Sequence, residues 1–193
     1  MASNLIEKPA GYLEGALLVA TPSLRESCFA RSVVYVFAHD EDGAMGLVIN
    51  HVFDNLNSKQ VFNQLHITDI TPSISLPIHF GGPVESERGF ILHTNDVLYP
   101  QTLKENKGIV LSSNVDLLKD IALGKGPKNV IFALGYAGWQ GGQLEEEIAH
   151  NQWITFPATT DIIFSHTRSS KWLETGKAFG IDLYRISDEA GHA

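Results

Sequence analysis

The stretch LGYAGWQGGQLEEEI, residues 134–148, places glycines between an apolar run and a Glu-rich segment. The glycines match neither the dinucleotide spacing G-x-G-x-x-G nor the G-K-[ST] ending of a P-loop. Glu145, Glu146 and Glu147 fall in the first turn of the expected helix, where their charges complement its positive end and would repel a phosphate. The stretch therefore predicts a strand, a glycine turn and a helix start rather than a nucleotide site.

Upstream of this stretch, short segments rich in β-branched and aromatic residues predict strands. They cover residues 16–21, 32–39, 44–50 and 89–94. The sequence DEDG at 40–43 supplies an Asp-Gly pair between two of them, which indicates a hairpin because glycine adopts positive φ at low cost. An antiparallel pair is expected there.

Apolar residues at helical spacing predict four helices. Ser58 caps a short first helix, residues 113–124 form the second, residues 143–150 the third and residues 169–180 the last. Residues 182–187 are expected to be a final strand. Strands come in adjacent groups without strict alternation with helices, so the fold class is α+β with a mixed sheet rather than a doubly wound parallel sheet.

The length of 193 residues, with 44% hydrophobic and 19% charged residues, indicates one domain over 1–193. Its core is expected at about 12–187, with short flexible termini and a frayed end at 188–193. No apolar run reaches the roughly 18 to 20 residues that span a bilayer, and the start lacks a signal peptide. Cys28 is the only cysteine, which suits a reducing compartment, so we expect a cytoplasmic protein without a membrane partner.

Charge argues against direct binding to nucleic acid, because Lys and Arg total 14 against 22 Asp and Glu and are scattered along the chain. No helix-turn-helix with a basic recognition helix is apparent. The acidic balance favours solubility instead.

Metal and nucleophile motifs are weak. Glu147 and His150 form one E-x-x-H without the second copy that a di-iron site needs. Three histidines near strand ends, His39, His79 and His93, have the residue type of a zinc site but are more typical of hydrogen-bonded core positions. Cys28 is expected to be buried beside Phe29 rather than to act as a nucleophile. We therefore expect no catalytic residue, no metal and no cofactor.

A second glycine stretch, HFGGPV at 79–84, predicts another sharp turn between strands. If the two glycine corners face each other, polar groups converge in an otherwise apolar pocket, the usual form of a small-molecule site. The candidate ligand cleft consists of Gly82, His93, Tyr136, Trp139 and Gln143. The alternative for the Trp139 corner is a structural role, in which the indole packs in the core.

Five segments together resemble the AlgH/YqgE family of uncharacterised bacterial proteins. They are GALLVATPSL (15–24), HDEDGAMGLVIN (39–50), HFGGPV (79–84), GFILH (89–93) and the opening stretch. The resemblance implies a single α+β domain with a curled, barrel-like sheet and flanking helices. It implies no catalytic or binding residue, although related proteins are often labelled transcriptional regulators.

The residues and the resemblance favour a noncatalytic binding or regulatory protein that acts through a protein partner or a small ligand. The first alternative is a hydrolase-like enzyme that uses a cleft between the glycine corners, with His93 or His39 as proton carrier and Glu145 or Glu147 as partner. The second is a DNA-binding transcriptional regulator.

Overall fold

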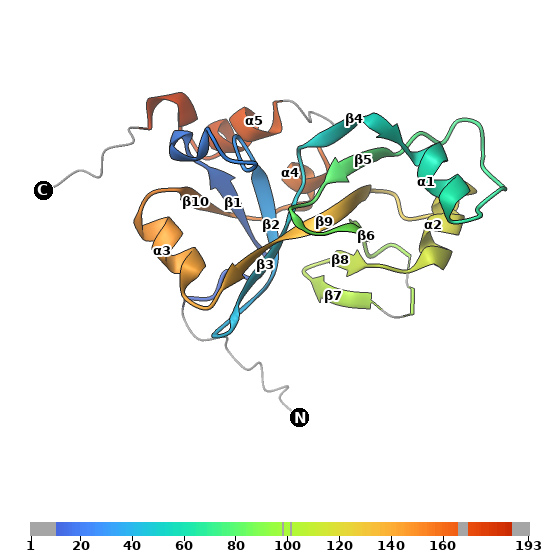
Figure 1. Ribbon diagram of the computed structural model, residues 1–193, viewed down its shortest axis with the longest axis horizontal. Helices are drawn as coiled ribbons and strands as arrows, with labels where there is room; N and C mark the ends of the chain where they lie inside the picture. The colour runs from blue at the N-terminus through green and yellow to red at the C-terminus, as the bar shows by residue number, and fades with distance from the viewer. Residues whose placement is uncertain (1–10, 98, 101, 166–169, 187–193) are drawn as a thin grey trace, which may run out of the picture.

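The computed structural model describes residues 11–97, 99–100, 102–165 and 170–186, so the frayed end expected at 188–193 lies outside the described residues. A curled, ten-stranded sheet runs through the elongated molecule, with helices at both ends (Figure 1). Most neighbouring strands are antiparallel, and one pair is parallel. This arrangement confirms the α+β class with a mixed, barrel-like sheet.

One half of the sheet consists of β10, β1, β2 and β3 in that spatial order. Their bounds are β1 Ala16–Ala20, β2 Val33–Asp40, β3 Gly43–Val48 and β10 Trp153–Pro157. Asp40 pairs with Gly43, which confirms the hairpin expected at DEDG. The strands β1 and β2 are almost wholly buried, because sheet and helices cover their Val- and Leu-rich faces.

The central strand β9, Val130–Gln140, connects the two halves. Residues 137–140 pair with β3, whereas residues 132–134 pair in parallel with β5. The expected glycine turn is therefore shorter than the glycine stretch: the strand continues through Gly135 and Gly138, and only Gly141 and Gly142 turn the chain into α3. Gly135 has a φ of +72°, which marks the point where β9 changes neighbours.

The other half of the sheet is built on β9 by five strands. They are β4 Val52–Asn57, β5 Pro77–Phe80, β6 Val84–Thr94, β7 Thr102–Asn106 and β8 Ile109–Ser112. The sequence patterns do not predict β4, β7, β8 or β10. Two of these, β4 and β7, are polar and mostly exposed, so they lack the apolar alternation that signals a strand.

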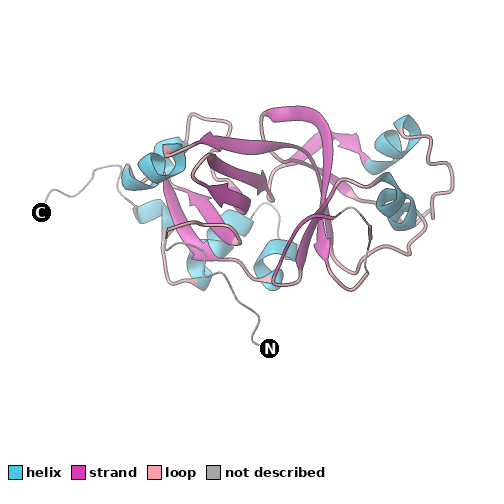
Figure 2. Cartoon of the chain, turned by 90° about the horizontal axis from the view of Figure 1, so that it is seen from below, coloured by secondary structure: helices cyan, strands magenta, loops and turns pink. Residues whose placement is uncertain are grey.

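Five helices flank the sheet in the described residues. They are α1 Ser58–Gln64, α2 Val115–Ala122, α3 Gln143–Ala149, α4 Thr160–Phe164 and α5 Lys171–Ala178. Asn57, not Ser58, caps α1 through a reciprocal capping box with Gln60. Figures 1 and 2 show α1 and α2 beside each other at one end, with α3 and α5 at the other.

Two short 3-10 helices complete the described chain: η1 Pro22–Leu24 and η2 Leu183–Arg185. The strand expected at 182–187 is wrong, because Asp182 accepts a hydrogen bond from the Tyr184 N–H and starts η2 instead. Within the described residues, no helix has both the length and the apolarity needed to cross a membrane.

Three groups of buried side chains hold the sheet to its helices. The first lies between the sheet and α4 and α5, the second lies around α3, and the third joins α1 and α2 to β6 and β9. Val115, the first residue of α2, stays outside these groups and is 41% exposed. The hollows between these packed groups are where a site can form.

Candidate functional site

The two glycine stretches lie in direct backbone contact. A Cβ added at Gly82 would come within 2.1 Å of the Tyr136 carbonyl carbon, and one added at Gly81 within 2.2 Å of the Gly135 carbonyl oxygen. The Gly81 N–H donates to the Leu134 carbonyl oxygen at 2.8 Å. Gly82 and Tyr136 are therefore in contact through close packing of their main chains.

Trp139 and Gln143 meet through a third residue, Glu147. The Nε1–H of Trp139 donates to Glu147 Oε2 at 2.7 Å, and the Nε2–H of Gln143 donates to Glu147 Oε1 at 2.8 Å. Trp153 Nε1–H also donates to Oε2, at 2.8 Å. Trp139 is only 7% exposed and packs with Ala44 and Leu144, which fits the structural role weighed for it.

His93 lies at the opposite end of β9 from this cluster, where it pairs with Val130. Its Nδ1–H donates to the Thr94 carbonyl oxygen at 2.8 Å, so in the neutral ring Nε2 accepts from the Ser112 hydroxyl at 3.1 Å. Burial lowers the pKa of His93, against the opposing effects of the Thr94 carbonyl and Asp96. The structure thus separates His93 from the other four residues, and a ligand at any of the five stays a prediction.

His39 does contact Glu145, one of the pairs considered for proton transfer. Nε2 lies 2.9 Å from Glu145 Oε1, and the Leu13 N–H donates to Nδ1 at 2.9 Å. Nδ1 is therefore the unprotonated nitrogen, and Nε2–H donates to the carboxylate. Both ring nitrogens are occupied by structural hydrogen bonds that tie the chain before β1 to α3.

The remaining histidine candidate, His79, lies on β5 with its Nδ1 3.3 Å from the Phe132 carbonyl oxygen. Among the described residues, no three His, Cys, Asp or Glu side chains gather as metal ligands would. The burial expected for Cys28 is wrong: the thiol is exposed because η1 and the turns after it project this segment from the sheet.

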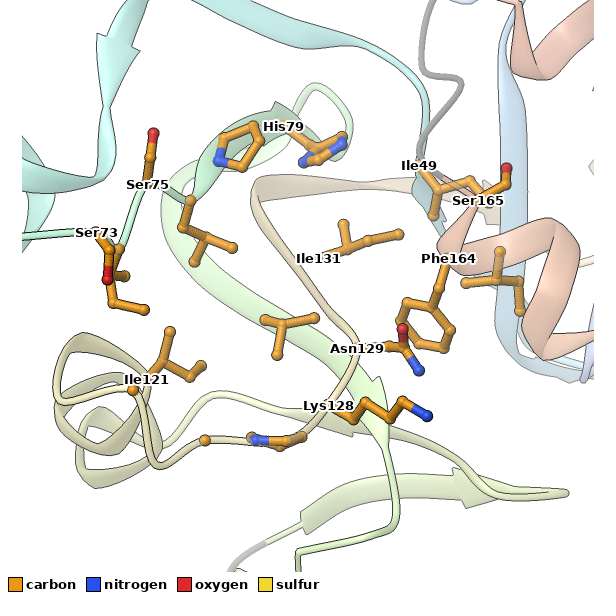
Figure 3. A pocket seen from close by; sticks show the side chains of 18 of the residues that line it. Ile49, Ser73, Ser75, His79, Ile121, Lys128, Asn129, Ile131, Phe164 and Ser165 are labelled. Atoms are coloured by element: carbon orange, nitrogen blue, oxygen red, sulfur yellow. The ribbon is translucent and has the colours of Figure 1, made fainter. Parts of the chain in front are cut away.

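A hollow of about 370 Å³ lies between the loop before β5, the loop from α2 into β9, and α4 (Figure 3). We call it the β5–α4 pocket. Its polar lining includes Ser73, Ser75, His79, Lys128, Asn129 and Ser165. Apolar side chains such as Ile121, Ile131 and Phe164 form the rest of the wall. Polar and apolar groups thus line the hollow in about equal measure, and a concave surface that combines the two can hold a small molecule.

Lys171 also lines this pocket and is 2% exposed. Its Nζ donates to the carbonyl oxygens of Ile162 at 3.0 Å and of Ile163. A buried ammonium group needs such acceptors, since desolvation without them is costly. The start of α5 is thereby fastened to α4 at the pocket wall.

Sequence patterns did not single out this pocket. TPSISLP at 71–77 and GKGPKN at 124–129 carry the Pro, Gly and Ser content of loops. That composition marks both segments as loops, but nothing local indicates that they line one pocket together with α4.

Comparison with known proteins shows similarity over most of the chain. The model of DUF179, described as AlgH-like, matches residues 17–184. A UPF0301 protein of Afipia carboxidovorans is 45% identical over 190 residues, which cover 94% of this chain and 90% of that protein. One from Pectobacterium atrosepticum is 42% identical over 185 residues, covering 94% and 99%.

Solved structures agree with this placement. The solution structure of the AlgH protein from Pseudomonas aeruginosa has a TM-score of 0.75 at 38% identity, covering 97% of this chain and 99% of that one. A crystal structure of a protein from Corynebacterium diphtheriae, 22% identical with a TM-score of 0.69, shares the fold. With a family model over most of its length and relatives above 40% identity, the chain belongs to the AlgH-like family DUF179.

Proposed function

We propose that this chain is a noncatalytic cytoplasmic binding protein that holds a small ligand in the β5–α4 pocket. The observation that carries the proposal is the pocket itself, a hollow of about 370 Å³ lined by hydroxyl, amide and basic groups together with apolar side chains. That volume lies within the roughly 300 to 1,000 Å³ of small-molecule sites. The cytoplasmic part of the proposal is supported by the single cysteine of the chain, which suits a reducing compartment.

The noncatalytic part of the proposal is supported by how the acid–base candidates are used. His39 and His93 each have both ring nitrogens in hydrogen bonds, and Glu147 accepts three. A general base needs a free lone pair within reach of a substrate proton. Direct DNA binding has little support, because the formal charge of -8 repels a phosphate backbone.

A chemically varied metabolite library tests the proposal when it is screened by thermal unfolding on three proteins. These are the wild type, Ser75→Phe and Ser86→Phe. Ser75 is exposed and lines the pocket, so a phenyl ring there occupies ligand space, whereas Ser86 is exposed and lies outside the pocket lining. A ligand that binds only the folded state raises the melting temperature.

We expect stabilising compounds to act on the wild type and Ser86→Phe but to lose their effect on Ser75→Phe. Compounds that stabilise all three proteins equally bind elsewhere and contradict the proposal. Action through a protein partner, the other mode that the sequence favours, stays a prediction.

A further inference from the structure

The charge of the β5–α4 pocket is opposite to that of the chain. The chain has 22 acidic and 14 basic side chains, yet the described pocket lining contains Lys128, Lys171 and His79 and neither Asp nor Glu. Given the composition of the chain, a patch of average composition would contain more carboxylates than basic groups. The local excess of cations and hydrogen-bond donors raises the local concentration of anions.

Lys128 is the exposed cation of this lining. None of the ion pairs between described side chains uses it. Figure 3 shows Lys128, Asn129 and Ser165 on the same side of the pocket as Phe164, with Ser73 and Ser75 opposite. The Lys128 ammonium group and the Asn129 side-chain amide on this wall can donate to an anion, whereas the Ser165 hydroxyl already donates to the Ile162 carbonyl oxygen at 3.1 Å.

The main chain at Lys128 and Asn129 is held by Thr94, the last residue of β6, and by Asp96 in the turn that follows it. The Lys128 N–H donates to Asp96 Oδ2 at 2.9 Å, and the Asn129 N–H donates to Thr94 Oγ1 at 3.3 Å. The Thr94 hydroxyl donates to the other oxygen of Asp96. The Asp96 carboxylate is thus occupied by a backbone donor and a hydroxyl donor. The same bonds set the position of Lys128 and Asn129 before a ligand arrives, which lowers the entropic cost of ordering them on binding.

The side chains of Ile121, Ile131 and Phe164 form the apolar part of the lining. An inorganic ion bound in the pocket would not contact them. A Cβ added at Gly126 would lie 2.5 Å from Ile121 Cγ1, so the glycine lets this loop approach α2 closely and shape the wall. A ligand that contacts both surfaces has an apolar part and a charged end.

From this arrangement we infer that the pocket binds a small organic anion, a carboxylate or phosphate ester with an apolar part, whose charged end lies at Lys128 and Asn129. This inference rests on the proposed function and adds the chemical class of the ligand. A lysine contributes a point charge without the planar fork of arginine, which suits either kind of anion.

Four probes with one phenyl ring and different head groups test the inference: phenyl phosphate, benzoate, benzamide and benzylamine. Each is titrated by NMR into the wild type, Lys128→Gln and Lys125→Gln. Lys125 is an exposed cation of the same loop but does not line the pocket, so its variant matches the charge change without the contact. The titrations extend to about 10 mM, since probes of this size bind with Kd values near the millimolar range.

We expect the two anions to shift amide signals of residues 124–131 and 163–165 and to bind more tightly than benzamide and benzylamine. Lys128→Gln should weaken anion binding about tenfold, the scale of one charge-assisted hydrogen bond, and leave benzamide unchanged. Lys125→Gln should change anion binding less than about twofold, because an exposed charge beyond contact range is screened.

Benzamide or benzylamine binding at the pocket as tightly as the anions would overturn the anion inference while leaving the proposed function standing. Anion-induced shifts centred elsewhere, equal losses in both lysine variants, or no shift at the pocket with either anion would also overturn it. The metabolite screen with Ser75→Phe then decides separately whether the pocket binds a ligand of another class.

Discussion

At the residue scale, Gly82 shows why the two glycine stretches need glycine. Its φ is +152°, and an added Cβ would meet the Tyr136 and Ala137 main chain at 2.1 to 2.3 Å. Backbone atoms cannot rotate away as a side-chain end can. We expect Gly82→Ala to lower the free energy of unfolding by about 3 kcal/mol or more, from backbone strain and overpacking together.

Gly142→Ala is the matched control for this prediction. Its φ is +79°, but nothing lies within 4 Å of an added Cβ, so only the left-handed strain of about 1 to 2 kcal/mol applies. Urea denaturation measures both variants. Equal losses would show that the contact between the glycine stretches contributes nothing beyond conformation.

His93 and His51 give the protein a pH dependence near neutrality. Burial lowers the pKa of both imidazoles, so the unfolded chain takes up protons at a higher pH than the folded one. Their contribution is complete above the unfolded pKa of about 6.5 and is lost as the pH falls below it. We expect the free energy of unfolding to decrease from about pH 7.5 to about pH 5.5.

Removing either imidazole tests the cause. His93→Gln and His51→Gln should each flatten the dependence of unfolding free energy on pH in this window, because one titrating group is gone from both states. Denaturation curves at several pH values measure the slopes. A slope that stays at the wild-type value in both variants would contradict the assignment.

At the scale of elements, α3 is attached to β9 and β10 through the Glu147 carboxylate, which accepts from Trp139, Trp153 and Gln143. Removing the carboxylate leaves two largely buried indole N–H groups without their acceptor. We expect Glu147→Ala to cost about 1 to 3 kcal/mol of unfolding free energy. Tryptophan fluorescence reports unfolding and the changed indole environment in the same experiment.

Glu146→Ala is the comparison for this helix. Glu146 is exposed, and its side chain makes no hydrogen bond within the described part of the chain, so the change should cost less than about 0.5 kcal/mol. Equal losses in the two variants would mean that a negative charge near the N-terminal end of α3, and not the indole contacts, accounts for them, since alanine itself favours the helix.

At the scale of the whole molecule, β9 joins the two halves of the sheet, and its residues 132–134 have neighbours on both edges. We expect the slowest amide hydrogen exchange there and much faster exchange in the exposed strand β7, whose one neighbour among the described strands is β8. Exchange followed by mass spectrometry measures this difference. Comparable protection of β7 and β9 would contradict it.

The elements that the sequence predicts well are those with a strong local signal. The hairpin at DEDG and α2, which begins after its Asn114 cap, follow from turn and helix chemistry that a few neighbouring residues decide. The exposed edge strands β4 and β7 are missed, because pairing with a neighbour and not their own pattern makes them strands. The final segment fails for a different, local reason, since Asp182 caps η2 at a position where the apolar pattern alone indicates a strand.

By itself, the sequence determined the α+β class, the hairpin, the family and the need for glycine at two corners, because each depends on residues that are adjacent or on a pattern carried along the chain. Only the tertiary structure decided that the glycine corners pack main chain to main chain, that His93 lies apart from Trp139, and that Ser73, Lys128 and Phe164 surround one pocket. Those three segments are distant in sequence. Their convergence depends on the long-range pairing of β5 with β9 and on α4 packing against the sheet, which no local pattern encodes.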